Sequence, residues 1–146
     1  MAGPGEILRL YAQNGLLPWL MEPVAEHLAR WEVICRCGVC FRCALSPEMK
    51  LLWSVLRERA AMPLVIASGL RCPAHQRKVN SAVSDSMHLH GEALDIRWPL
   101  GMERRAFLDL AETVAGKGGL GVYPWGIHID TGKGKAPRRR WGKFKM

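Results

Sequence analysis

The stretch Ser86-Met-His-Leu-His-Gly-Glu-Ala-Leu-Asp-Ile-Arg97 runs from a polar turn into a short alternating strand. Within that strand, Leu94 and Ile96 share one face and Asp95 lies on the other. A second stretch, Gly126-Ile-His-Ile-Asp130, alternates in the same way. If the two strands are neighbours, their polar groups converge on one open surface and their apolar groups enter a core.

Histidines on both sides of Asp95 in the chain indicate a metal site. Gly91 allows a tight turn that brings His88 beside Asp95, and His128 lies on the polar face of the second strand. Two imidazoles and one carboxylate leave a position for water, as in a catalytic zinc site. His90 is the rival ligand to His88. The alternative interpretation is structural, with the histidines capping a loop and Asp95 accepting backbone hydrogen bonds.

Short motifs spread over most of the chain carry a family resemblance. They are Ser68-Gly-Leu-Arg-Cys-Pro73, Asn80, Ser86-x-His-x-x-Gly-x-Ala-x-Asp95, Gly119-x-Gly-x-Tyr-Pro124, Ile127-His-x-Asp130 and Arg140-Trp141. In this order the chain resembles the zinc D-alanyl-D-alanine carboxypeptidase and L-alanyl-D-glutamate endopeptidase family, from about Cys35 to Trp141. That family includes bacterial and phage peptidoglycan peptidases and shares its fold with the hedgehog signalling domain.

The resemblance implies a ligand set and a substrate site. It implies that one catalytic Zn²⁺ is bound by three residues: His88, Asp95 and His128. Arg71 matches the arginine that orients substrate, and its forked guanidinium suits a peptide carboxylate or a developing oxyanion during catalysis. Asn80 and Ser86 match family positions near the site, and we assign them to substrate binding.

The general base is the point at which the chain departs from the family pattern. Many relatives carry an acid three positions before the last histidine ligand, where this chain has Trp125. Asp130 lies two residues after His128 on the same strand face, and we interpret it as the catalytic base. It could instead orient His128 through a hydrogen bond. Glu92 is another candidate, but strand alternation points it away from Asp95.

Four of the five cysteines follow the pattern Cys35-x-Cys37-x₂-Cys40-x₂-Cys43, and Cys72 lies in the first family motif. Such a dense cluster can bind a second, structural metal, with Cys72 as a further ligand. Structural zinc sites usually draw ligand pairs from separate elements, so four ligands in one loop would need a strongly folded loop. Reduced core cysteines and disulfides are the alternatives.

Composition places the chain among ordinary globular proteins. Of its 146 residues, 49% are hydrophobic and 23% are charged, which excludes collagen-like, coiled-coil and wholly disordered chains. The net charge of +8 is concentrated in residues 133–146, the basic tail, which holds seven Lys and Arg and no acid. Trp141 and Phe144 among these cations are typical of single-strand nucleic-acid binders, but the family match favours an aromatic packed on the domain. We therefore expect no specific nucleic-acid partner, and attraction to an anionic envelope instead.

Helices and strands are mixed without regular alternation, which predicts an α+β fold with a small, mostly antiparallel sheet. Helices are expected over residues 6–13, 24–31, 46–61, 73–80 and 102–115. Strands are expected over residues 64–67, 92–97, 120–123 and 126–130. The core face of the third helix is assigned to Leu51, Leu52, Val55 and Leu56. The domain division is an N-terminal helical arm at 1–34, a zinc peptidase domain with a cysteine-rich start at 35–141, and a basic end at 142–146.

Together, the resemblance and the patterns predict a monomeric zinc peptidase that cleaves peptidoglycan stem peptides. Its activity would be that of a D-Ala-D-Ala carboxypeptidase or an L-Ala-D-Glu endopeptidase, in a phage or prophage lysis enzyme. No segment approaches the roughly 20 apolar residues of a membrane helix, and the start of the chain lacks the pattern of a signal peptide. We expect synthesis in the cytoplasm and action on the cell wall after release. The alternative is a non-catalytic zinc-binding or wall-binding module of the same fold.

Overall fold

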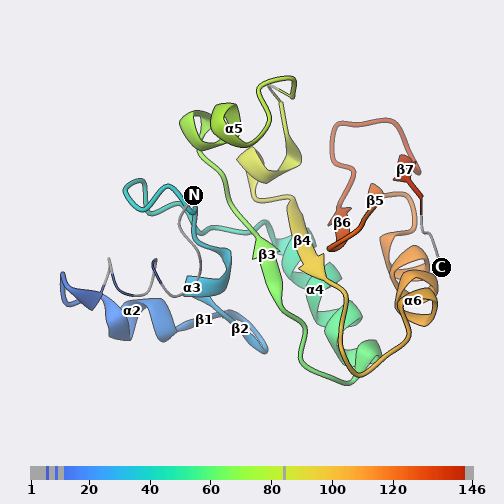
Figure 1. The fold of residues 1–146 in the computed structure, drawn as a ribbon, viewed down its shortest axis with the longest axis horizontal. Coiled ribbons are helices and arrows are strands. Elements are labelled where there is room, and N and C mark those ends of the chain that lie inside the picture. The colour runs from blue at the N-terminus through green and yellow to red at the C-terminus, as the bar shows by residue number, and fades with distance from the viewer. Residues whose placement is uncertain (1–5, 7–8, 10–11, 84, 144–146) are drawn as a thin grey trace.

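The computed structural model describes residues 6, 9, 12–83 and 85–143 (Figure 1). Its helices are α2 (Leu17–Met21), α3 (Arg30–Val33), α4 (Pro47–Ala60), α5 (Pro73–Val79), the 3₁₀ helix η1 (Met87–His90) and α6 (Arg104–Ala115). Its strands are β1 (Pro23–Ala25), β2 (Leu28–Ala29), β3 (Ile66–Ser68), β4 (Ala93–Arg97), β5 (Leu120–Tyr123), β6 (Gly126–Asp130) and β7 (Arg140–Gly142). Half of the residues of the helix expected over residues 6–13 lie outside the described residues.

The main sheet has the strand order β3-β4-β6-β5-β7. Neighbouring strands from β3 to β5 pair antiparallel, whereas β7 pairs parallel with β5. β1 and β2 form a separate two-stranded sheet. The expected mixture of helices and strands is confirmed, and the expected antiparallel pairing is confirmed only in part, because the edge strand β7 runs parallel to its neighbour.

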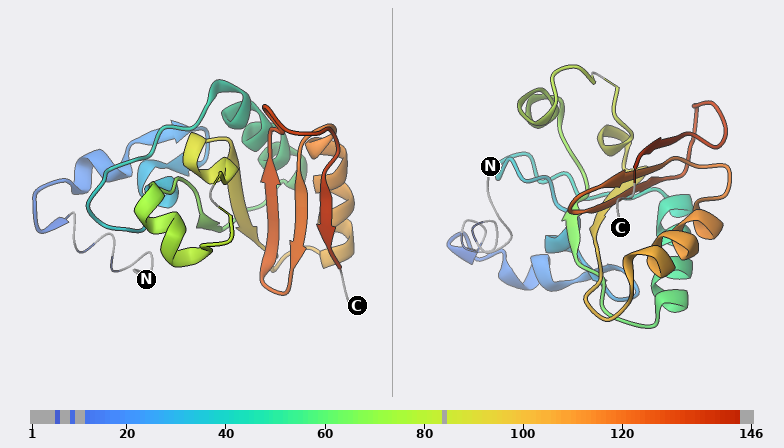
Figure 2. Two further views of the ribbon diagram at one scale, coloured as in Figure 1. Left: turned by 90° about the horizontal axis from the view of Figure 1, so that it is seen from above. Right: turned by 45° about the vertical axis from the view of Figure 1, so that its right-hand side comes forward.

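Apolar side chains on one face of the main sheet pack against α4 and α6. Leu94 and Ile96 of β4 belong to the same buried cluster as Trp53 of α4 and Phe107 of α6. Figure 2 (right) shows these two helices on one side of the sheet and α5 with η1 on the opposite side. The long helices therefore cover the apolar face, and the polar face is left to the segments around α5 and η1.

Helix α4 begins where the sequence predicts a capping serine. Ser46 Oγ accepts a hydrogen bond from Met49 N at 3.0 Å, and Pro47 follows at the first helical position. The expected core face is right for Leu56, and Leu52 packs partly buried against the core, but Leu51 is 66% exposed. The buried residues are Met49, Trp53, Leu56 and Ala60. The helix is rotated so that the large Trp53 ring is buried, which removes more apolar surface from water than the smaller aliphatic side chains do.

The prediction of a helix over residues 24–31 is wrong, because the chain forms a β1–β2 hairpin there. His27 has a φ of +58°, which ends any helix at the turn. A contact that is distant in the sequence supports the hairpin: Trp53 Nε1 donates to Glu26 O at 2.9 Å. Leu28 of β2 is buried in the main core. Local apolar spacing carries no information about either contact.

The four expected strands agree closely with the sequence, whereas β7 was not expected. β5 and β6 have the expected bounds, β4 begins one residue later than expected, and β3 is shifted from residues 64–67 to Ile66–Ser68. The division into an arm, a peptidase domain and a basic end stays a prediction, and Val33 of the arm lies in the main core. In the described part of the chain, every helix is too short or too polar to cross a bilayer.

Gly91→Ala is expected to destabilise the fold, because Gly91 has a φ of +67° and an added Cβ would lie 2.2 Å from Ala44 O. The left-handed backbone and the overlap together predict a loss of at least about 2 kcal/mol in the free energy of unfolding, measured by urea denaturation. Gly134→Ala is the matched control, since Gly134 has a φ of +74° and nothing lies within 4 Å of its added Cβ. Equal losses in the two variants would contradict the importance of the contact between Gly91 and Ala44.

Candidate metal centre

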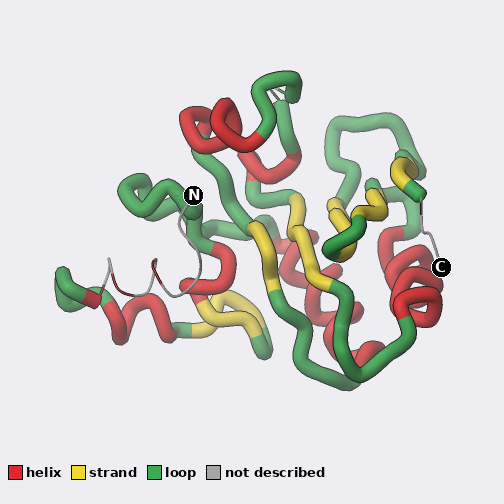
Figure 3. The backbone as a smooth tube through the Cα atoms, viewed as in Figure 1, coloured by secondary structure: helices red, strands yellow, loops and turns green. Residues whose placement is uncertain are grey.

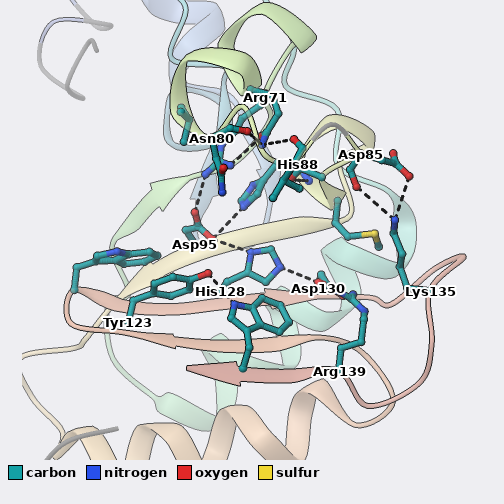
Figure 4. A pocket seen from close by; sticks show the side chains of 17 residues that line it. Arg71, Asn80, Asp85, His88, Asp95, Tyr123, His128, Asp130, Lys135 and Arg139 are labelled. Carbon is teal, nitrogen blue, oxygen red and sulfur yellow. Dashed lines mark hydrogen bonds and ion pairs between the residues drawn. The ribbon is translucent and has the colours of Figure 1, made fainter. Parts of the chain in front are cut away.

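Strand register brings Asp95 and His128 together. The two residues are paired across β4 and β6, which confirms that these strands are neighbours. His88 comes from η1, where Ser86 Oγ accepts from His88 N at 3.2 Å and Gly91 ends the turn. Figure 4 shows the three side chains pointing toward one another inside a pocket. The polar face of the sheet and the adjacent turn thus build one group.

The facing atoms of this group lie close enough to share one metal ion. His88 Nε2 and His128 Nδ1 are each 3.0 Å from Asp95 Oδ1. One donor atom from each residue lies within 4.8 Å of the other two, and all three residues are buried. Two imidazole nitrogens and a carboxylate oxygen are a donor set that suits zinc.

The outer nitrogen of each imidazole is held by an acceptor. His88 Nδ1 lies 2.6 Å from Gly69 O, and His128 Nε2 lies 2.8 Å from Asp130 Oδ2. Because a carbonyl or an ionised carboxylate can only accept, these outer nitrogens carry the N–H, and each inner nitrogen is the one that faces Asp95 Oδ1 and can bind a metal when it is deprotonated. A bound cation would take the place of the protons between Asp95 Oδ1 and the two imidazoles, and all three atoms could then bind it.

The Asp95 side chain is almost fully buried and depends on charged or polar partners. The residue is 6% exposed, and its Oδ2 accepts from Arg71 Nη2 at 3.0 Å. Burial raises the pKa of Asp95, but His88 and His128 outweigh burial and hold that pKa well below its usual range. Arg71 is fixed in turn by donating to Ser68 Oγ at 3.2 Å. One carboxylate oxygen is therefore held by Arg71, and the other faces the imidazoles.

Both carboxylate oxygens of Asp130 are engaged. Oδ1 accepts from Gly119 N at 2.9 Å, Gly132 N at 2.8 Å and Arg139 Nη2 at 2.7 Å, and Oδ2 contacts His128. The side chain is fully buried, at 0% exposed. Burial raises the pKa of Asp130, but His128 and the other donors outweigh it and lower the pKa to about 2. This geometry favours an orienting contact to His128 over the interpretation of Asp130 as the base.

The group lies in a cavity of about 570 Å³. All three residues that we assigned to substrate binding line it: Arg71, Asn80 and Ser86. Asn80 Oδ1 accepts from Ala82 N at 3.2 Å, and Ser86 caps η1, so both side chains also hold the backbone of their own segments. The structure therefore brings the predicted substrate residues to the same cavity as the predicted ligands.

Two other candidates from the sequence, His90 and Glu92, lie apart from the group. His90 is exposed, and its Nε2 contacts Asp85 Oδ1 at 2.8 Å. Glu92 is buried, and its carboxylate accepts from Thr131 Oγ1. The structure thus separates the rival ligand from His88 and directs Glu92 away from the cavity, as strand alternation predicts.

The sequence interpretation expected an aromatic residue of the tail to pack on the domain, but it did not place Trp141 and Tyr123 at the cavity, where β7 and β5 bring them. The Trp141 ring packs on His128 with ring centroids 5.1 Å apart, and its Nε1 donates to Tyr123 Oη at 2.8 Å. Gly121 makes room for this ring, because an added Cβ would lie 2.3 Å from Trp141. Gly121 is paired with His128 across β5 and β6. A glycine opposite a ligand histidine is the sequence signal that could have revealed the packed tryptophan.

The described part of the basic tail, residues 133–143, joins the sheet through β7 and is not simply a solvated end. Arg139 donates to Asp130 at 2.7 Å, and Arg140 donates to Glu112 of α6 at 2.9 Å and to backbone carbonyl groups that follow α6. Figure 3 shows the long loop that leads from β6 to β7 and so places this segment. The guanidinium groups of Arg139 and Arg140 therefore bind acceptors within the fold, and this part of the positive charge is less accessible to a partner.

The cysteines meet at a second place. One sulfur atom from each of four residues lies within 4.8 Å of the others: Cys35, Cys37, Cys40 and Cys72. Cys43, which the sequence placed in the cluster, is outside this group and packs against the hydrophobic core. All five cysteines are free thiols in this structure. Cys72 thus joins the cluster from a separate segment.

A protein-family model described as Peptidase M15 matches residues 26–130. The matched range contains the three residues of the metal-ligand group, and it ends before β7 and the Trp141 ring. It agrees with the family that the sequence motifs resemble, over nearly the same part of the chain. No curated protein matches the chain.

Asp130→Asn is expected to weaken zinc binding by about 10- to 100-fold, because a neutral amide no longer fixes the proton of His128 at Nε2. Competition with a chromogenic chelator measures the change. Asp85→Asn is the control, since Asp85 lines the same cavity but is exposed and bonds His90 and Lys135. Unchanged zinc affinity in Asp130→Asn together with lost catalysis would instead support Asp130 as the base.

Proposed function

The chain belongs to the peptidase M15 family of zinc-dependent metallopeptidases, and from this premise we propose that it cleaves the peptide stems of bacterial peptidoglycan. Its reaction is that of a D-Ala-D-Ala carboxypeptidase or an L-Ala-D-Glu endopeptidase. The observation that carries the proposal is the convergence of His88 Nε2, Asp95 Oδ1 and His128 Nδ1 inside an open cavity. Three protein ligands leave room for water and substrate, as catalytic zinc sites require.

Neighbouring groups of the protein keep the outer nitrogen of each ligand histidine protonated and hold Asp95 in place. Asp130 keeps the N–H of His128 at Nε2, and a backbone carbonyl keeps that of His88 at Nδ1. Arg71 holds Asp95 Oδ2, so that Oδ1 faces both imidazoles. Zinc bound by these residues would supply Lewis-acid chemistry, polarising the scissile carbonyl and making water more acidic. In this proposal Asp130 and Arg71 act as positioning residues for the ligands.

Several residues of the same cavity remain for the substrate. Arg71 uses part of its guanidinium within the protein, and its further N–H groups can meet a peptide carboxylate or a carbonyl oxygen. Tyr123 Oη accepts from Trp141, which leaves its own proton to donate to a substrate carbonyl. Asn80 and Ser86 lie at the same cavity and complete the proposed substrate site.

Digestion of purified peptidoglycan by the zinc-loaded protein is expected to produce chain ends that identify the bond. Free D-alanine marks a carboxypeptidase, and new L-alanine carboxyl and D-glutamate amino ends mark an endopeptidase. His88→Ala is expected to lower the rate by about 1000-fold or more, because loss of a zinc ligand removes several kcal/mol of transition-state stabilisation. His90→Ala is the matched control from the same motif and is expected to keep the rate, since His90 lies outside the group.

Two outcomes would contradict the proposal in different ways. If the zinc-loaded protein sediments with peptidoglycan but releases no new ends, hydrolysis is excluded, and a non-catalytic wall-binding module is supported. If His88→Ala and the unaltered protein release ends at the same rate, the ligand assignment is wrong while hydrolysis stands.

We further propose a lytic role in a phage or prophage, in which the protein acts on the same substrate. The net charge of +8 favours adsorption to anionic wall polymers. We expect the protein to lower the turbidity of permeabilised bacteria, more slowly as salt rises because salt screens the attraction, and we expect His88→Ala to leave the turbidity unchanged. Permeabilised cells that resist the protein while their isolated peptidoglycan is digested would contradict the lytic role.

A further inference from the structure

The cysteine group lies outside the candidate metal centre and is built from two segments. Cys35, Cys37 and Cys40 come from the loop between α3 and α4, and Cys72 directly precedes α5. Their sulfur atoms lie within 4.8 Å of one another, so a single ion can contact all four. Cys43, the next cysteine along the loop, is excluded from the group.

Backbone packing explains why these two segments meet. Leu70 N donates to Val33 O at 2.8 Å, so the segment before Cys72 runs beside the end of α3. Gly69 permits this approach, because an added Cβ would lie 2.5 Å from Val33 O. Cys35 immediately follows that contact. The backbone contact between these two segments thus brings Cys72 to the cysteine loop without requiring a metal ion.

Backbone N–H groups are directed at the sulfur atoms. Cys37 Sγ accepts from Val39 N at 3.4 Å and from Cys40 N at 3.3 Å, within a turn that Gly38 forms at a φ of +81°. Cys35 Sγ accepts from Cys72 N at 3.3 Å. Cys72 Sγ accepts in turn from a backbone N–H of α5 at 3.4 Å. Such donors favour the thiolate over the thiol and orient the sulfur lone pairs, as partners of metal ligands do.

A buried cation adjoins the group on the chain. Arg36 lies between Cys35 and Cys37 and is only 5% exposed. Its Nη2 donates to Glu32 O at 3.3 Å, whereas its Nη1 has no hydrogen-bond partner among the described residues. A buried guanidinium is costly unless negative charge lies nearby. Glu32 and Cys35 already attract the Arg36 guanidinium, and four thiolates around a divalent ion would add net negative charge beside it.

We propose that Cys35, Cys37, Cys40 and Cys72 bind a structural Zn²⁺. Four thiolates that enclose an ion tetrahedrally leave no position for water, which is the pattern of structural zinc. The two segments are a cysteine loop and a distant helix start, so the ion ties the cysteine loop, which directly follows the N-terminal arm, to the segment that carries Arg71. Since Arg71 directly precedes Cys72, this ion supports the candidate metal centre without taking part in its chemistry.

The test counts zinc in a background that lacks the other metal group. In the full chain with His88→Ala and His128→Ala, elemental analysis is expected to find about one zinc per chain. Adding Cys37→Ser is expected to remove it, and adding Cys43→Ser, the matched control, is expected to retain it. Zinc-free protein in the histidine background, or equal zinc content with Cys37→Ser and Cys43→Ser, would overturn the proposal.

A second measurement uses the unaltered histidines and does not require Cys37→Ser to be stable. Cobalt-substituted protein is expected to show thiolate-to-metal charge-transfer absorption, and its cysteines are expected to react with a thiol reagent faster after a chelator is added. Full reaction of all five thiols without chelator, a disulfide in the non-reduced protein, or iron in place of zinc would overturn the proposal. None of these readouts depends on peptidase activity, so they stay separate from the test of the proposed function.

Discussion

The candidate metal centre depends on the antiparallel register of β4 and β6. In that register Asp95 stands opposite His128, while Leu94 is paired with Ile129 on the core side. A slip of one residue would exchange the two faces, placing aliphatic side chains in the cavity and a carboxylate in the core. Full burial of one aliphatic side chain contributes about 1.5–3 kcal/mol, so the apolar side of the sheet fixes the register on which the polar side relies.

The polar side is stable only as a connected set, because a buried carboxylate without a partner is costly. Asp95 pairs with Arg71, Asp130 pairs with Arg139, and His128 bonds both carboxylates. Removal of either arginine would leave a buried negative charge that its remaining partners balance less well. The ion pair between Arg139 and Asp130 also explains why the described part of the basic tail lies beside the candidate metal centre. The ligands of that centre are a carboxylate and two imidazoles, which a basic segment can adjoin.

Local alternation was enough to predict the strands that carry Asp95 and His128, and the family motif distinguished His88 from His90. The errors have a shared cause, since each missed feature is stabilised by contacts distant in the sequence. The hairpin at residues 23–29 depends on a hydrogen bond from α4. The aromatic contact at the cavity between Tyr123 and Trp141 depends on the Trp141 ring of β7, which fills the space above Gly121 in β5. Asp130 is such a case only in part, because His128 and Gly132 are two residues away in the chain. The fold brings in the other two partners, Gly119 and Arg139, from 11 and 9 residues away.

Gly69 connects the metal centre with the cysteine group. Its carbonyl oxygen accepts from His88 Nδ1 at 2.6 Å, which determines the nitrogen that faces Asp95. Its missing side chain lets the backbone of Val33 approach, and the same approach carries the cysteine loop to Cys72. A backbone segment tied at one end to a proposed zinc site opens less readily than a free loop. Because the position of that carbonyl sets the proton on a ligand histidine, the N-terminal arm stabilises the centre without touching it.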